Sequence, residues 1–332
     1  TIAAISTPQA AGGIGIVRIS GPEARAIAGR VFTSARGKTL EQCRGYTALY
    51  GRVHDAEGEI DEAIALNFIA PASFTGEDVV ELSCHGGIYV MRRVLQAVFA
   101  AGAAPAGPGE FTRRAFLNGR LDLTQAEAVV DLIDAETAAA ARNAAAQLDG
   151  GLRRVLEPVQ EELLEVTSRF YAVVDYPDED IQDVRPEEIA AALRSAAGRL
   201  ERLLDTCRRG QVLKSGVRTA IVGRPNAGKS SLLNALAGYE RAIVTDIPGT
   251  TRDTVEESVL CGGVLLRLID TAGIRATEDP VEQLGVERSR RAIASAELVL
   301  AVVDGAVPED SEEGSLLADV ARCGVPWLLV FT

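Results

Sequence analysis

The sequence predicts a multidomain protein in which an α+β N-terminal domain is followed by a helical domain and an α/β domain with a doubly wound sheet. Three observations support this prediction. The 332 residues exceed the usual length of one domain. Residues 1–118 mix short apolar runs with glycine and proline, whereas residues 119–215 are rich in alanine, leucine and glutamate. From residue 216 onward, apolar runs alternate with helical stretches, as in a sheet with helices between its strands.

The composition excludes several functional classes. Apolar residues make up 47% of the chain, and no apolar run reaches the roughly 20 residues of a membrane helix. Because phosphate binding relies on Lys and Arg, a net charge of −13 argues against a broad nucleic-acid-binding face. The five cysteines are widely separated, which argues against disulfides and a zinc site. The start at Thr1 lacks a signal-peptide pattern, so we expect a shortened chain of a cytoplasmic protein without membrane association.

The first predicted domain, residues 1–118, contains two apolar runs with the length of strands, Ile14–Ile19 and Ala63–Ile69. The glycines that begin at Gly12 resemble a dinucleotide-binding loop. That motif requires a third glycine at the position of Arg18, so we reject a dinucleotide site here.

The second predicted domain, residues 119–215, is expected to be helical. Thr124–Glu127 has the spacing of a capping box and begins a helical stretch that continues to about Tyr171. A proline and several acids in Asp175–Asp180 predict a loop. Apolar residues at three- and four-residue steps then predict an amphipathic helix from about Glu187 to Arg209.

The third predicted domain, residues 216–332, alternates strands with helices. The first strand is expected at Arg218–Val222 and is followed by a glycine-containing loop and a helix from Lys229 to Ala237. A further helix is expected at Gly285–Ala294. The other predicted strands are Val264–Ile269, Leu298–Val303 and Trp327–Phe331.

The loop between the first strand and helix, Gly223–Ser230, matches the phosphate-binding pattern G-x-x-x-x-G-K-S. Its glycines allow backbone amides to surround phosphates at a helix N-terminus, where the dipole favours anions. We expect Lys229 to contact the β- and γ-phosphates and the Ser230 hydroxyl to bind Mg²⁺. The nucleotide contacts predicted here are Asn226, Ala227, Gly228, Lys229, Ser230 and Ser231.

Two further motifs complete the predicted nucleotide site. Asp270 follows an apolar strand and begins D-T-A-G, a pattern that acts on the magnesium shell and senses the γ-phosphate. The polar stretch Thr245–Asp253 is interpreted as a switch I loop, with Thr251 as the second Mg²⁺ ligand. The contacts predicted from both motifs are Thr245, Asp246, Ile247, Pro248, Gly249, Thr250, Thr251, Asp270, Thr271, Ala272 and Gly273.

The motifs alone do not identify the residue that orients the attacking water. Ras-type enzymes carry a glutamine after D-x-x-G, whereas this chain has Ile274, which can neither orient water nor accept a proton. Arg252 and Arg275 lie near the motifs, but neither is a self-evident arginine finger. The nearby acidic candidates are Glu278, Asp279, Glu282 and Glu287.

The nucleotide motifs resemble those of MnmE, Era and Der GTPases, and the first 120 residues distinguish among these families. The segments Gly12–Gly21, Ser73–Asp78, Glu81–Leu82, His85–Gly87, Pro108–Thr112 and Arg114–Asn118 resemble the N-terminal domain of the MnmE (TrmE) family of TRAFAC-class P-loop GTPases. The resemblance covers the whole chain. It implies a folate-binding N-terminal domain, a helical domain and a G domain inserted in that helical domain.

The resemblance also implies a function. Such proteins are GTP hydrolases that work with the FAD-dependent protein MnmG to add a (carboxymethyl)aminomethyl group to C5 of wobble uridine 34 in certain tRNAs. The one-carbon unit is attributed to 5-formyltetrahydrofolate, bound at a homodimer interface through Arg18, Glu81 and Arg120. Guanidinium groups suit the glutamate tail of folate, and a carboxylate can pair with pterin N–H groups.

For hydrolysis, the resemblance identifies Glu282 as the catalytic residue that orients water. K⁺ takes the place of an arginine finger when two G domains meet, and its implied ligands are Asn226, Thr245, Ile247 and Thr250. The guanine-reading N-K-x-D motif would begin where the chain stops, at Thr332, so guanine specificity rests on the resemblance.

Two alternatives stay open. A ribosome-assembly GTPase of the Era or Der class would bind RNA, and it predicts a basic RNA-binding domain or a second P-loop, neither of which we find in the sequence. In the other alternative, residues 1–118 form an independent folate-dependent transferase and the G domain is only regulatory.

Overall fold

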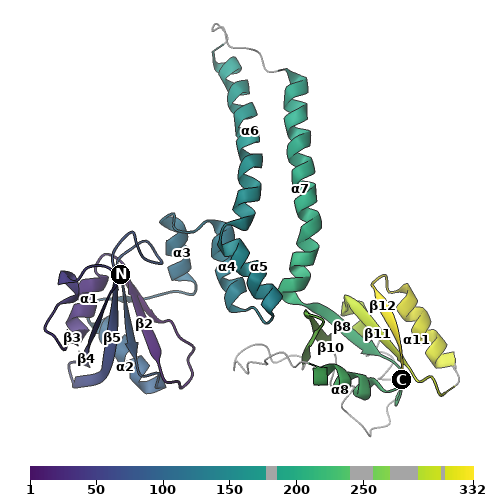
Figure 1. Cartoon of the computed structure of the whole chain (residues 1–332), viewed down its shortest axis with the longest axis horizontal. Helices are drawn as coiled ribbons and strands as arrows, with labels where there is room; N and C mark the ends of the chain where they lie inside the picture. Colours follow the sequence, from purple (N-terminus) through teal and green to yellow (C-terminus); the bar gives the residue numbers. More distant parts are fainter. Residues whose placement is uncertain (177–184, 240–256, 270–290, 308–310) are drawn as a thin grey trace. The chain divides into compact units, whose positions relative to one another are not determined.

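The computed structural model describes residues 1–176, 185–239, 257–269, 291–307 and 311–332 (Figure 1). These residues form two compact units, Thr1–Val129 and Val130–Thr332, and each unit is described by itself. The predicted mixture of α+β, helical and α/β parts is confirmed.

The first unit is built on a seven-stranded mixed sheet with the strand order β3-β4-β5-β6-β2-β1-β7. All neighbouring strands are antiparallel except β1 and β7, which are parallel. The strands are β1 (Ile2–Ile5), β2 (Gly15–Ser20), β3 (Phe32–Ser34), β4 (Thr47–Asp55), β5 (Gly58–Phe68), β6 (Val79–Cys84) and β7 (Ala104–Pro105). Strand β2 contains the first predicted apolar run except Ile14, and β5 contains the second except Ile69.

Two helices, α1 (Ala24–Val31) and α2 (Ile88–Ala100), pack against the same face of this sheet and share one core with it. Val17 and Ile19 of β2 lie fully buried in that core. Because side chains alternate along a strand, Arg18 between them belongs to the opposite face. The unit also contains the short 3₁₀ helix η1 (Leu40–Gln42) and helix α3 (Glu110–Leu117).

Four helices follow: α4 (Leu123–Ile133), α5 (Ala138–Leu148), α6 (Gly151–Asp175) and α7 (Pro186–Ser215). The predicted capping box at Thr124 is wrong, because Asp122 accepts from the Gln125 N–H and the Gln125 side chain accepts from the Asp122 N–H. The first helix therefore begins before Thr124. Helix α7 is longer than predicted at its C-terminal end.

Helices α6 and α7 lie side by side in the second unit (Figure 1). Val159 of α6 and Ala192 and Ala196 of α7 are buried. Helix α6 ends at Asp175, and most of the predicted loop after it lies outside the described residues. Within the part of the chain that the structure describes, no helix combines the length and apolarity needed to cross a bilayer.

The second unit contains a five-stranded mixed sheet with the order β12-β11-β8-β10-β9. Its strands are β8 (Val217–Val222), β9 (Glu257–Cys261), β10 (Val264–Ile269), β11 (Leu298–Val303) and β12 (Trp327–Phe331). Only the β9–β10 pair is antiparallel among these strands. Four of the strands match the predictions. Strand β9 was not predicted, although the Gly262–Gly263 turn that joins it to β10, with φ of 58° and 84°, is a hairpin signal.

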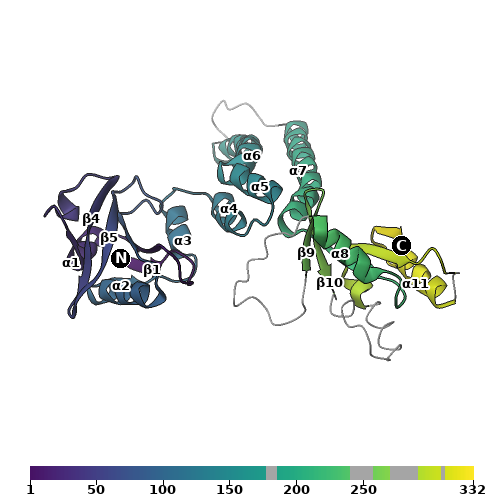
Figure 2. The ribbon, with the colours of Figure 1, turned by 60° about the horizontal axis from the view of Figure 1, so that its bottom comes forward.

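Helices cover both faces of this sheet. Helix α8 (Lys229–Tyr239) contributes Leu233 to a core on one face, and Figure 2 shows this helix beside β9 and β10. Helix α11 (Ser311–Arg322) and the helical residues 291–295 contribute to a core on the other face. Residues 291–294 belong to a predicted helix whose earlier part lies outside the described residues.

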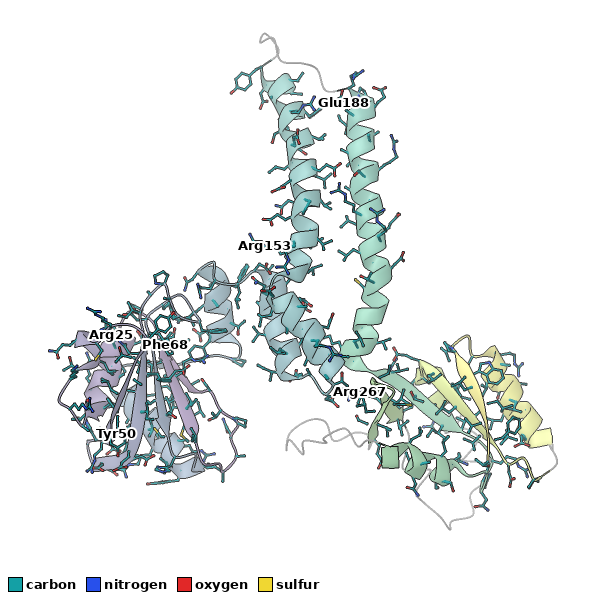
Figure 3. The ribbon with its side chains drawn as sticks, in the orientation of Figure 1. Arg25, Tyr50, Phe68, Arg153, Glu188 and Arg267 are labelled. Atoms are coloured by element: carbon teal, nitrogen blue, oxygen red, sulfur yellow. The ribbon has the colours of Figure 1, made fainter. Side chains whose placement is uncertain are left out.

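Helix α7 runs directly into β8, and a charged contact accompanies this junction. Arg267 of β10, labelled in Figure 3, donates from Nε to the Ser215 carbonyl at the end of α7, over 2.7 Å. Its Nη2 lies 2.7 Å from Oε1 of Glu136. The strand that precedes the D-T-A-G motif is therefore tied to the helices of the same unit.

Candidate functional site

The glycine loop of the second unit lies between β8 and α8. The strand ends at Val222 and the helix begins at Lys229, so the predicted strand–loop–helix arrangement is confirmed. Asn226 and Gly228 have positive φ angles of 65° and 83°. Glycine adopts this left-handed backbone without strain, and asparagine is one of the few other residues that tolerates it. The two positions curl the backbone immediately before the helix N-terminus.

Lys229 lies against the loop that it follows. Its Nζ donates to the carbonyl oxygen of Gly223 over 2.8 Å and also to the Arg224 carbonyl. Burial lowers the pKa of this lysine below its ordinary value, because an apolar environment disfavours the charged form. An anion held by the loop would offset that cost, so the ammonium is suited to a phosphate.

The other loop residues fit a phosphate and a magnesium ion. Ala227 is buried, whereas Asn226 and both serines, Ser230 and Ser231, are exposed at the start of α8. Free N–H groups at a helix N-terminus attract anions, and a serine hydroxyl is a hard oxygen ligand of the kind that Mg²⁺ prefers. The described residues thus supply a cation, an amide-lined loop and an oxygen ligand in one contiguous segment.

The remaining predicted nucleotide contacts lie outside the described residues. These are Thr245–Thr251, Asp270–Gly273 and the candidate catalytic residue Glu282, and their roles stay predictions. One related fact is described: β10 ends at Ile269, directly before Asp270, and runs parallel to β8 as its neighbour. The carboxyl ends of parallel neighbours meet at the same edge of a sheet. Asp270 therefore follows the strand adjacent to the one that precedes the glycine loop.

A second candidate site lies in the first unit, on the sheet face opposite α1 and α2. Arg18 of β2 and Glu81 of β6 are directly opposite each other in the antiparallel pairing. Arg18 donates from Nε to Glu81 Oε1 over 2.8 Å, and its Nη2 lies 2.7 Å from the same oxygen. Two of the three residues predicted to contact folate are therefore in contact with each other.

Two aromatic rings flank the Arg18 guanidinium. Its carbon lies 5.4 Å from the ring centre of Phe74 and 5.5 Å from that of Phe111, within the range of cation–π attraction. Arg120, the third predicted residue, donates from Nε to the Ser73 carbonyl over 3.1 Å. The structure thus places Arg120 against the segment that carries Phe74.

The sequence interpretation missed both phenylalanines as site residues. They lie inside S-F-T-G-E-D and P-G-E-F-T, two segments that carried the family resemblance, so a signal was available. A carboxylate, guanidinium groups and aromatic rings can together hold a flat hydrogen-bonding ring system and an anionic group. A shallow pocket of about 300 Å³ lies in the same unit and is lined by Glu77, Glu110, Arg113, Arg114, Leu117 and Asn118.

The glycine loop, its lysine and the surrounding α/β sheet define the class of the protein as P-loop nucleotide-binding. The family models identify it further. Residues 1–120 match a model described as "GTP-binding protein TrmE N-terminus", and residues 123–317 match one described as "MnmE helical domain".

Three curated relatives, each described as "tRNA modification GTPase MnmE", are similar over almost the whole chain. The relative from Symbiobacterium thermophilum is 53% identical over 330 residues, which are 98% of this chain and 72% of the relative. That from Lactobacillus delbrueckii subsp. bulgaricus is 51% identical, covering 96% and 68%. That from Chloroflexus aurantiacus is 50% identical, covering 100% and 72%. The chain belongs to the MnmE family of tRNA modification GTPases, as its motifs predicted.

Proposed function

We propose that the chain binds and hydrolyses GTP at the Gly223–Ser231 loop, and that hydrolysis drives the addition of a (carboxymethyl)aminomethyl group to C5 of uridine 34 in tRNA. The FAD-dependent protein MnmG is the proposed partner. The observation that carries the proposal is the position of Lys229, whose ammonium lies against a phosphate-binding loop in a member of a tRNA modification GTPase family. That membership favours this function over a ribosome-assembly role of the Era or Der class.

The nucleotide chemistry is divided among residues of the loop and the two switch motifs. Lys229 and the loop amides bind the phosphates, Ser230 and Thr251 hold Mg²⁺, and Asp270 acts on the magnesium shell. Glu282 orients the attacking water. The ligands of K⁺ are Asn226, Thr245, Ile247 and Thr250. When bound, the two cations offset the negative charge that develops on the phosphates.

The first unit is proposed to bind 5-formyltetrahydrofolate, which when bound supplies the one-carbon unit of the modification. Arg18 and Arg120 bind the carboxylates of its glutamate tail, and Glu81 accepts hydrogen bonds from the pterin. The support is chemical: Arg18 and Glu81 form a half-buried pair beside the rings of Phe74 and Phe111, which are suited to a flat ligand.

We propose domain limits at 1–118, 119–215 and 216–332, with the G domain inserted in the helical domain. A helical family model that extends over 123–317, across β8 to β11, supports the insertion. We also propose a cytoplasmic homodimer formed through the sheet face that carries Arg18. On that face Tyr50 and Ile64 are paired across β4 and β5 and are 56% and 45% exposed, which favours a second copy as the covering partner.

The proposed folate site can be tested by isothermal titration calorimetry of 5-formyltetrahydrofolate with the chain of residues 1–332. We expect wild-type protein to bind 5-formyltetrahydrofolate, and Arg18→Ala and Arg120→Ala to weaken it by about tenfold each, because each removes a charge-assisted contact. Arg36→Ala is the matched control, since it removes the same charge from an exposed turn of the same unit. Absence of binding by the wild-type chain would overturn the folate assignment.

A further inference from the structure

We propose that Glu77 and Arg114 are positioning residues of the first-unit site: together they hold the two segments that place Phe74 and Phe111 against Arg18. The inference rests on the proposed folate site for its function. The contacts that Glu77 and Arg114 make can be tested in the chain without folate.

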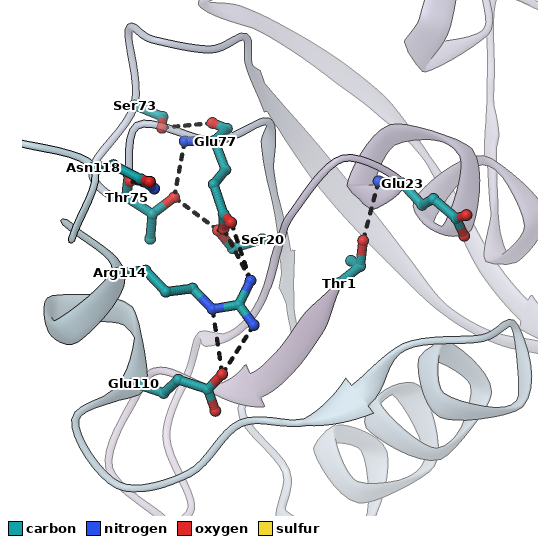
Figure 4. Close-up of polar contacts among 9 residues, drawn as sticks. All are labelled: Thr1, Ser20, Glu23, Ser73, Thr75, Glu77, Glu110, Arg114 and Asn118. Atoms are coloured by element: carbon teal, nitrogen blue, oxygen red, sulfur yellow. Dashed lines mark hydrogen bonds and ion pairs between the residues drawn. The ribbon is translucent and has the colours of Figure 1, made fainter.

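The contact between these segments is a charged cluster centred on Arg114 (Figure 4). Its Nη1 lies 3.1 and 3.2 Å from the two carboxylate oxygens of Glu77. Its Nε and Nη2 lie 3.2 and 2.9 Å from Oε1 of Glu110. The Arg114 guanidinium thus binds two carboxylates. The side chains of Arg114, Glu77 and Glu110 are only 22–23% exposed. Such partly buried, charge-assisted bonds are less screened by water than surface ion pairs.

On one side, Glu77 belongs to a loop that is fixed to the end of β2. Ser20 donates from Oγ to Glu77 Oε2 over 2.7 Å, and the Ser20 and Thr75 hydroxyls lie 2.7 Å apart (Figure 4). Ser20 and Thr75 are fully buried. Ser73 donates from Oγ to the Glu77 carbonyl over 2.6 Å. Phe74 is therefore carried by a loop that is bonded on both sides of it.

On the other side, Arg114 belongs to α3, which begins at Glu110 and carries Phe111 in its first turn. The Glu110 carboxylate accepts from the Gly107 N–H over 2.7 Å. This bond and then the Arg114 guanidinium lower the pKa of Glu110, so the carboxylate is charged at neutral pH. Asn118 at the end of the helix donates from Nδ2 to the Thr75 carbonyl over 2.7 Å.

The Glu77–Arg114 contact affects the two aromatic rings that flank Arg18. Arg18 is held by Glu81 across the β2–β6 pairing, which does not involve α3 or the loop. Phe74 and Phe111, in contrast, depend on those two segments. Removing the Arg114 guanidinium should therefore change the distance of the rings from Arg18 while the Arg18–Glu81 pair is retained. A ligand bound to Arg18 would lose part of its aromatic surroundings.

The first test observes Arg18 directly. Aromatic rings shift the NMR signals of nearby protons, so the Arg18 Nε–H signal reports on Phe74 and Phe111 in the chain without folate. We expect Arg114→Met to move this signal toward its position in a Phe74→Leu, Phe111→Leu double variant. The matched control is Arg93→Met, which breaks a two-bond pair with Asp55 of similar exposure, 24% and 19%. An unmoved signal in Arg114→Met, or an equal movement in Arg93→Met, overturns the inference.

The second test measures 5-formyltetrahydrofolate affinity. We expect a loss of about tenfold for Arg114→Met and a smaller loss, below about threefold, for Arg114→Lys, which keeps the charge but lacks the planar fork. Wild-type affinity in Arg114→Met overturns the positioning role. If Arg114→Met does not fold, Glu77→Gln replaces it in both tests, because it keeps the shape and weakens the ion pair. If the wild-type chain binds no folate, the proposed function fails, and the Arg18 signal still decides the geometric claim.

Discussion

Replacement of Gly223 by alanine tests how closely the nucleotide loop is packed against the sheet. Gly223 follows β8 directly, beside β11. A Cβ at this position would lie 2.4 Å from the backbone carbonyl oxygen of Val302 and 3.3 Å from its carbonyl carbon. The obstacle is backbone in the middle of a sheet, so a side-chain rotation cannot relieve the contact.

The size of the effect follows from that distance. Ordinary Cβ contacts begin near 3.4 Å, so the loop and β11 must separate by about 1 Å. Overpacking of a closely packed site costs about 1–3 kcal/mol of unfolding free energy. A displacement of this size at groups that bind substrate reduces activity by on the order of 10²-fold, and we expect phosphate binding to weaken in the same direction.

The assay uses a probe that the chain already contains. Trp327, the only tryptophan, lies on β12 next to β11, so its fluorescence during urea unfolding follows this sheet. Binding of a fluorescent GTP analogue follows the loop. Gly305→Ala is the control, because its Cβ would meet nothing closer than 3.8 Å. The reasoning is refuted if Gly223→Ala unfolds and binds like wild type, or if Gly305→Ala is equally damaging.

Two further predictions concern hydrolysis and pH. We expect Glu282→Ala to abolish GTP turnover while the affinity for GTP stays nearly unchanged, and we expect hydrolysis to be slower in Na⁺ than in K⁺. A loss of GTP affinity in Glu282→Ala, or equal hydrolysis rates in the two salts, would contradict the proposed roles of Glu282 and K⁺. The hydrogen bond to Asp61 and then its charge raise the pKa of His85 above 6.5. We expect an NMR titration of His85 to show this raised pKa, and we expect Asp61→Asn to return the pKa toward its ordinary value. The pair's stabilisation is complete below pH 6.5 and is lost as pH rises through the raised pKa.

The glycine loop and the start of helix α4 were both predicted from residues that are neighbours in the sequence, and the second of these predictions was wrong. The strand, glycine loop and lysine from Arg218 to Lys229 were predicted correctly, because the pattern is contiguous and its backbone angles are local properties of asparagine and glycine. Helix α4 begins at Leu123, before the start that the Thr124–Glu127 spacing predicts. Aspartate at 122 and glutamine at 125 also satisfy the capping-box spacing, and only the observed hydrogen bonds decide between the two positions.

The sequence by itself determined the family and the phosphate-binding loop, since both depend on residues that are adjacent in the chain. Only the tertiary structure decided what surrounds Arg18. Glu81, Phe74 and Phe111 come from a neighbouring strand, a loop and a helix that lie far from Arg18 in sequence. Strand register and helix packing bring them together, and those depend on long-range burial that no local pattern specifies.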